Sequence, residues 1–207
     1  MKPLFESLSE SHLQWLPELG IGWYPVTEAP YDAAYWARYR RQDATETGAA
    51  LTRARCALVS RHLMGRPGTV VDIGIGGGRF VEASGARGFD INPAAIDWLQ
   101  TNDRWFDPYS APFHAATFWD SLEHIHDPAP LLANVRGVAF VSLPIFSGPE
   151  HIVRSKHFRK DEHCWYFTRA GFIDFMDRHG FRMLEVNVME QHCGREDIES
   201  YAFARRI

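Results

Sequence analysis

The chain has 207 residues, of which 45% are hydrophobic and 23% are charged, and this balance is typical of a soluble globular protein of one ordinary domain. No apolar run reaches the length of a membrane span, and the net charge of −4 disfavours long nucleic acid, whose binding depends on many cationic contacts to phosphates. A nucleotide or a single base remains possible as a substrate. The first eleven residues lack the apolar segment of a signal peptide, and three scattered cysteines are too few for a disulfide framework, so we expect a cytoplasmic protein.

An aromatic-rich leader of about 41 residues opens the chain. Four of its aromatic residues fall at helical spacing: Tyr31, Tyr35, Trp36 and Tyr39. Most leader aromatics are expected to fasten it to the core, but this helical face could also serve as a lid over a flat ligand. Residues 43–46 resemble a capping box with Asp43 as the cap, which predicts a further helix that ends before Gly65. We therefore divide the chain into a helical leader, residues 1–65, and a core, residues 66–207.

A short apolar strand and a glycine-rich turn begin the core. The run from Thr69 to Ile73 is typical of a buried parallel strand, and Asp72 interrupts it near its carboxyl end, where ligands of open α/β sheets bind. Four glycines follow within five residues: Gly74, Gly76, Gly77 and Gly78. Glycine permits positive φ and lets a ligand lie against bare backbone, and a helix that begins at Arg79 would offer free N–H groups.

Spacing separates the two ligand classes that use such a turn. A dinucleotide fingerprint needs G-x-G-x-x-G, and it fails because the third position is Arg79 when counted from Gly74 and Val81 when counted from Gly76. The pattern that is present is D-x-G-x-G-x-G: Asp72, Gly74, Gly76 and Gly78. It resembles the first motif of class I S-adenosylmethionine (SAM) dependent methyltransferases. In that family the loop passes under the methionine part of SAM.

A second short strand ends in Asp90, and Asn92 then caps a helix with Pro93 at its first position. In the methyltransferase family an acid at this place accepts hydrogen bonds from both ribose hydroxyls of SAM. The resemblance therefore assigns Asp90 and its neighbour Ile91 to the cofactor site. The interval from Gly78 to Asp90 is shorter than is usual in the family, so the first crossover helix should have only about two turns.

Later segments supply further cofactor candidates. Residues 104–108 are expected to form the third strand. Its counterpart in the family lies beside the adenine ring, which makes Trp105, Phe106 and Asp107 candidates. Residues 114–120 are expected to form the fourth, buried strand, which ends in the candidates Trp119 and Asp120.

Two blocks narrow the resemblance. Residues 122–128 read L-E-H-I-H-D-P and resemble a segment of the ubiquinone-biosynthesis-like small-molecule methyltransferases. Residues 162–168 resemble the E-H-x-x-x-F-T block of the same group. The implied fold is α/β and Rossmann-like: a doubly wound, mostly parallel seven-stranded sheet with a C-terminal antiparallel hairpin, over residues 182–189 and 200–206, and an N-terminal helical, aromatic-rich lid.

The candidate catalytic residues are His124 and His163, one from each of these two blocks. Methyl transfer from a sulfonium requires alignment, and it requires a general base only if the acceptor carries a proton. Histidine is the base best suited to neutral pH, although a structural role for either histidine stays open. Four further residues are candidates for contact with the substrate: Tyr35, Tyr39, His157 and Trp165.

Other chemistries find little support in the sequence. Among ten histidines, the pairs His163–Cys164 and His192–Cys193 are adjacent, so their side chains would point apart on a strand. No C-x-x-C or H-x-x-x-H spacing occurs, and we expect no metal. The absence of G-x-S-x-G argues against a serine nucleophile.

The sequence thus predicts an enzyme that transfers a methyl group from SAM to an oxygen, nitrogen or carbon of a small molecule and leaves S-adenosylhomocysteine. A non-catalytic binding module of the same fold is one alternative, and a methyltransferase acting on a nucleotide or a nucleic acid base is another. A nicotinamide-dependent dehydrogenase is more distant. The sequence does not indicate an oligomeric state.

Overall fold

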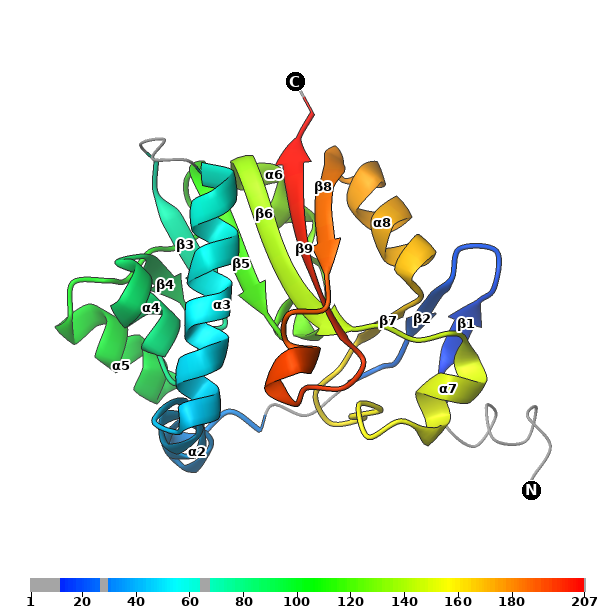
Figure 1. Cartoon of the computed structure of the whole chain (residues 1–207), viewed down its shortest axis with the longest axis horizontal. Coiled ribbons are helices and arrows are strands. Elements are labelled where there is room, and N and C mark those ends of the chain that lie inside the picture. Colours follow the sequence, from blue (N-terminus) through cyan, green and yellow to red (C-terminus); the bar gives the residue numbers. More distant parts are fainter. Residues whose placement is uncertain (1–11, 27–29, 64–67, 207) are drawn as a thin grey trace.

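The computed structural model describes residues 12–26, 30–63 and 68–206. A six-stranded sheet in the order β4-β3-β5-β6-β9-β8 forms its centre (Figure 1). In chain order its strands are β3 (Val70–Ile73), β4 (Arg87–Phe89), β5 (Phe113–Trp119), β6 (Val135–Pro144), β8 (Phe181–Asn187) and β9 (Ile198–Arg205). Strands β4, β3, β5 and β6 are parallel, whereas β9 pairs antiparallel with both β6 and β8. The mostly parallel sheet and the C-terminal antiparallel hairpin are confirmed.

The prediction of seven strands is wrong for the described residues, because the segment expected to form the third strand forms no strand. Residues 104–108 form only an isolated bridge, in which Trp105 lies parallel to Gly88 at the free edge of β4. Asp103 has a positive φ of 52°, and Pro108 lacks a backbone N–H to donate to a ladder. The extended segment between Asp103 and Pro108 is too short to form more than this one bridge.

Helices cover both faces of the sheet, and this explains why its central strands are largely buried and mostly apolar. The helices concerned are α3 (Glu46–Leu63), α4 (Arg79–Ser84), α5 (Pro93–Thr101), α6 (Ala129–Asn134) and α8 (Arg169–Arg178). On the face that Figure 1 turns to the viewer, Leu58 of α3 packs in one cluster with Phe140. A larger cluster joins Leu131 of α6 and Phe172 of α8 to Phe118. The short helix α4, of 6 residues, agrees with the expected brief crossover.

The sequence suggested a helical leader, but part of the leader forms β-strands. β1 (Gln14–Leu16) pairs with β2 (Ile21–Trp23), and β2 pairs with β7 (Trp165–Phe167), so these strands form a second, three-stranded sheet. The partner β7 lies far away in the sequence, and local periodicity does not report such a pairing. The helix α7 (Pro149–Arg154) lies near this small sheet (Figure 1). The predicted boundary between residues 65 and 66 lies outside the described residues.

The expected helix over the aromatic face is present as α2 (Ala33–Asp43), and its N-cap is Asp32. The predicted capping box is displaced by two residues. Asp43 ends α2, and Thr45 Oγ1 accepts a hydrogen bond from Gly48 N at 3.1 Å at the start of α3. Within the residues that the structure describes, no helix has both the length and the apolar character needed to cross a membrane.

Candidate functional site

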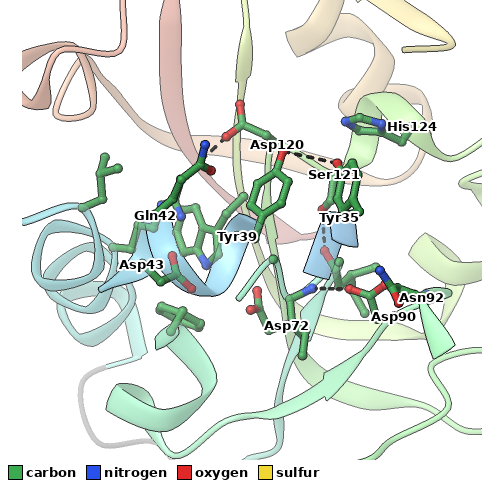
Figure 2. Close-up of a pocket in the computed structure, with 18 of the residues that line it drawn as sticks. Tyr35, Tyr39, Gln42, Asp43, Asp72, Asp90, Asn92, Asp120, Ser121 and His124 are labelled. Atoms are coloured by element: carbon green, nitrogen blue, oxygen red, sulfur yellow. Dashed lines mark hydrogen bonds and ion pairs between the residues drawn. The ribbon is translucent and has the colours of Figure 1, made fainter. Parts of the chain in front are cut away.

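A cavity of about 730 Å³ opens at the carboxyl ends of β3, β4 and β5, beside α2 and α3. This volume lies within the range of small-molecule sites, and the position is the one expected for ligands of an open α/β sheet. Figure 2 shows Asp72 and Asp90 on one side of it and Tyr35 and Tyr39 of α2 on another. Most of the predicted site residues line this cavity: Asp72, Gly74, Gly76, Asp90, Ile91, Trp119, Asp120, Tyr35, Tyr39, His124, His157 and His163.

The glycine turn between β3 and α4 uses each glycine differently. Gly74, Gly76 and Gly78 have positive φ values of 75°, 55° and 83°, which favour glycine. A Cβ on Gly74 would lie 2.7 Å from the Cβ of Ser121, so this position is closed by packing. Among the described residues, a Cβ on Gly76 would meet only Tyr39, at 3.6 Å. Gly76 therefore presents bare backbone to the cavity, which allows a ligand to approach closely.

Gly78 lies outside the cavity lining, so its contact with a ligand stays a prediction. It is the N-cap of α4, and a Cβ there would come within 3.0 Å of the Trp98 ring. Its positive φ and close packing place the start of α4, so its role in the turn is structural.

Asp90 follows β4 and holds the turn together. Its Oδ2 accepts a hydrogen bond from Ile75 N at 2.9 Å, and its Oδ1 accepts one from Asn92 N at 2.8 Å. Burial raises the pKa of Asp90, and these backbone N–H groups act in the opposite direction. Each carboxylate oxygen can accept a second hydrogen bond, so the group keeps its capacity for two hydroxyl donors of a ligand. The next residue, Ile91, is 62% exposed at the edge of the cavity.

Asp72 gives the cavity a buried acid whose charge responds to pH. Its side chain, 1% exposed, accepts a hydrogen bond from Thr117 Oγ1 at 2.6 Å. Burial raises the pKa of Asp72 to about 7, although Thr117 and Arg55 act against this rise. Near neutral pH the carboxyl is therefore poised between its two forms, and a cationic ligand would favour the ionised one.

A network of arginines and acids forms the wall beside Asp120, and sequence reasoning missed most of it. Arg195 forms an ion pair with Asp120 and a second, at 2.6 Å, with Glu190. Arg55 of α3 reaches Glu190 at 2.7 Å, and its guanidinium carbon lies 5.1 Å from the centre of the Trp119 ring. Asp120 is thus already paired with a cation of the protein. No local motif marks Arg55 or Arg195, because only the fold brings their segments together.

Helix α2, together with Tyr31 just before it, lines the cavity with tyrosines that contact distant segments. The Tyr35 hydroxyl lies 3.1 Å from Glu162 Oε2 and 3.2 Å from the Tyr39 hydroxyl. The Tyr31 hydroxyl lies 3.1 Å from His124 Nδ1. The spacing of these aromatics therefore identified a surface that faces the cavity.

His124 and His163 lie together, with ring centroids 4.6 Å apart in an edge-to-face arrangement. Burial lowers the pKa of His124 to about 4 and lowers that of His163 well below its ordinary value. Both imidazoles are thus neutral at physiological pH and weakly basic. Burial raises the pKa of the neighbouring Glu123 carboxyl, which is 1% exposed. Potential ligand atoms of Glu123, His124 and His163 all lie within 4.8 Å of one another.

Two predicted contacts lie outside the cavity lining. Asp107 Oδ1 accepts a hydrogen bond from Tyr109 N at 2.9 Å, so this carboxylate stabilises a turn, and Tyr109 lines the cavity instead. Trp165 donates its Nε1–H to the carbonyl of Ile125 at 2.9 Å and stacks on Phe167 within the core. Both side chains therefore form their hydrogen bonds within the protein. His157 does line the cavity, and its Nε2 lies 3.0 Å from the carbonyl oxygen of Glu196.

Solved structures of similar fold include several methyltransferases. A magnesium protoporphyrin IX methyltransferase from Synechocystis, with bound S-adenosylhomocysteine, is 13% identical, with a TM-score of 0.60 over 84% of this chain and 96% of that one. A 1,6-didemethyltoxoflavin-N1-methyltransferase from Burkholderia thailandensis is 15% identical, with a TM-score of 0.54 over 94% and 99% of the two chains. A possible histamine N-methyltransferase from Thermotoga maritima is 15% identical, with a TM-score of 0.56 over 84% and 97%. At such low sequence identities, the structural similarity shows that the fold is shared and no more.

The sequence itself gives the family. No curated protein matches the chain significantly. A family model described as a methyltransferase domain, however, matches residues 39–186, which include the glycine turn, Asp90 and the Glu123–His124 segment. The match covers well over half of the chain, which therefore belongs to the methyltransferase domain family and is a SAM-dependent methyltransferase of the class I, Rossmann-like fold.

Proposed function

We propose that this enzyme transfers the methyl group of SAM to an oxygen, nitrogen or carbon atom of a small molecule. One observation carries the proposal: a single cavity at the carboxyl edge of the sheet contains the glycine turn, Asp72 and Asp90. Each has a property that SAM requires. Gly76 presents open backbone, and Asp90 has free acceptor capacity for the ribose hydroxyls. Asp72 offers a negative charge for a donor that carries a sulfonium and an ammonium group.

The acceptor would lie between α2 and the two histidines. Tyr35, His124, His157 and His163 line the part of the cavity that adjoins the segment after β5 and the loop before β7. Neutral imidazoles in a buried wall can orient an acceptor and exclude water, and their low basicity favours positioning over proton removal. Alignment alone supplies several kcal/mol towards such a displacement, and this role suits a cavity covered by aromatic rings.

Small acceptors fit both the cavity volume and the fold. The similar structures include enzymes whose names specify magnesium protoporphyrin IX and 1,6-didemethyltoxoflavin as substrates. The L-E-H-x-x-D-P segment further supports placement in the ubiquinone-biosynthesis-like group. Retention of Asp72, Gly76 and Asp90 in one cavity favours an enzyme over a non-catalytic binding module, since such a module has no need of this set.

Calorimetry with SAM, S-adenosylhomocysteine and NAD, together with the Asp90→Ala variant, tests the proposal. We expect both adenosyl compounds to bind and NAD not to bind. Hydrogen bonds to a charged group contribute about 1.5–3 kcal/mol, so Asp90→Ala should weaken SAM binding about tenfold or more. Asp97→Ala, at an exposed position of α5, is the matched control and should bind SAM normally. Unchanged SAM affinity in a folded Asp90→Ala protein would contradict the assignment.

A further inference from the structure

The cluster of Glu123, His124 and His163 contains buried polar atoms to which the proposed methyl transfer gives no role. Glu123 belongs to the short helix η1 (Leu122–His124), whereas His163 precedes β7. Glu123 is 1% exposed and His163 is 3% exposed. Among the residues that the structure describes, neither carboxylate oxygen of Glu123 has a hydrogen-bond partner, and His163 Nδ1 has none either. Three polar atoms are therefore buried without partners in one place.

Unpartnered buried polar atoms of this kind are rare, because burial removes their hydrogen bonds to water without replacement. A carboxylate pays the largest penalty, since an ionised oxygen in an apolar interior needs a positive partner. The nearby cations are already engaged. Arg159 contacts Glu162, and Arg195 forms ion pairs with Asp120 and Glu190. Among the described residues, no arginine therefore forms an ion pair with Glu123, and the charges of Arg159 and Arg195 counter only part of the rise that burial causes in its pKa.

We propose that Glu123, His124 and His163 bind a divalent transition-metal ion, with zinc as the reference member of the class. Two imidazoles and one carboxylate are a ligand set for Zn²⁺, Mn²⁺ or Fe²⁺, whereas Mg²⁺ and Ca²⁺ prefer oxygen ligands alone. One potential ligand atom from each residue lies within 4.8 Å of the other two. Bonds of about 2.1 Å separate tetrahedral ligands by about 3.5 Å, so small side-chain rotations would complete the set.

The spacing rules that argued against a metal could not detect this site. They look for ligands close together in the sequence, whereas Glu123 and His163 become neighbours because β7 packs beside η1. Cys164 N, for example, donates to the carbonyl oxygen of Glu123 at 2.8 Å. The cluster therefore depends on the tertiary structure.

The position of the cluster gives the ion a further use, and this part rests on the proposed function. His124 and His163 line the cavity, and three protein ligands leave at least one coordination position for another molecule. An acceptor that carries an oxygen or nitrogen donor could occupy that position. The ion would then hold the acceptor in place beside the methyl donor, and the acceptor class narrows to metal-coordinating small molecules.

Metal binding can be measured directly on tag-free, full-length protein that has been stripped with a chelator. The protein is incubated with Zn²⁺, Mn²⁺ or Mg²⁺ and gel-filtered, and its metal content is determined by elemental analysis. Calorimetry with SAM is run on the same samples. The variants are Glu123→Gln and His163→Ala, and His151→Ala on α7, outside the cavity lining, is the matched histidine control. Circular dichroism verifies that each variant is folded.

We expect about one equivalent of Zn²⁺ in the wild type and in His151→Ala, and little Mg²⁺ in either. Glu123→Gln and His163→Ala should bind Zn²⁺ at least about tenfold more weakly, and Co²⁺ bound to the wild type should show the absorption bands of nitrogen and oxygen ligands. Should Glu123→Gln fail to fold, His163→Ala carries the test alone.

Two results would overturn the metal site: a folded wild type that retains no transition metal, or equal retention by all four proteins, which would place the metal elsewhere. If the wild type binds SAM but no metal, the inference fails and the proposed function stands. If it binds metal but not SAM, the metal site stands and the proposed function fails.

Discussion

At the scale of single residues, the cavity depends on acids that are buried more deeply than acids usually are. Asp72 is the clearest case, because burial raises its pKa to about 7. Between about pH 4 and pH 7 the folded protein therefore binds more protons at this group than the unfolded chain does, and its stability falls as pH rises through this window. Such a cost is typical of residues retained for function.

Replacing Asp72 by asparagine, which has nearly the same shape, should stabilise the free protein while weakening its function. The pKa shift corresponds to up to about 4 kcal/mol at pH 8, so the thermal midpoint of Asp72→Asn should exceed that of the wild type increasingly from pH 5 to pH 8. Affinity for SAM should behave oppositely. It should be about tenfold weaker than in the wild type at pH 8 and similar at pH 5.5, where the wild-type carboxyl is protonated.

Thermal unfolding and calorimetry across this pH range provide the measurements. Asp97→Asn, at an exposed position of α5, is the control. If Asp72→Asn and the wild type differ by the same amount in SAM affinity at both pH values, the charge of Asp72 does not act on the cofactor.

At the scale of elements, the turn between β3 and α4 determines where a ligand can approach. Gly74 is closed by Ser121, whereas Gly76 has open space on its cavity side. The same motif thus contains a glycine needed for packing and a glycine needed for ligand approach.

Gly76→Val should abolish SAM binding in a protein that remains folded. The new side chain would enter the cavity, and the positive φ of 55° costs about 1–3 kcal/mol, which a domain of this size can tolerate. Gly85→Val is the matched control, because Gly85 has a similar φ of 73° at the end of α4 but lies outside the cavity lining. Calorimetry should find SAM binding in Gly85→Val alone, and normal binding by Gly76→Val would mean that the cofactor lies elsewhere.

At the scale of the whole molecule, α2 connects segments that are far apart in the chain. Asn92 Nδ2 donates to the carbonyl oxygen of Asp32 at 2.9 Å, and Arg40 Nη1 donates to that of Gly77 at 2.8 Å. On its other side, the Tyr35 hydroxyl meets Glu162. The helix therefore lies beside both the proposed cofactor half and the proposed acceptor half of the cavity, where a lid would lie.

Hydrogen exchange with and without SAM tests this lid. SAM should increase protection in residues 31–43 and, through Glu162, in residues 157–163 together, because ligand contacts on either side favour the closed position. Tyr39→Ala should then reduce turnover far more than SAM affinity once an acceptor is known. Equal exchange in residues 31–43 in both states would show that α2 is a fixed wall.

The sequence by itself determined the α/β class and the glycine turn after a buried strand, and it predicted cofactor contacts for Asp72, Gly76 and Asp90, which the structure brings into one cavity. These features follow from local patterns: a short apolar run, glycines at positive φ, and an acid at a strand end. The tertiary structure alone decided the features that depend on residues far apart in the chain. Pairing of β2 with β7 turned part of the leader into a sheet, and packing brought Arg55 and Arg195 to the same acid, Glu190, and Glu123 next to His163. Local periodicity records the environment of one segment, whereas these contacts depend on how segments distant in the chain pack together.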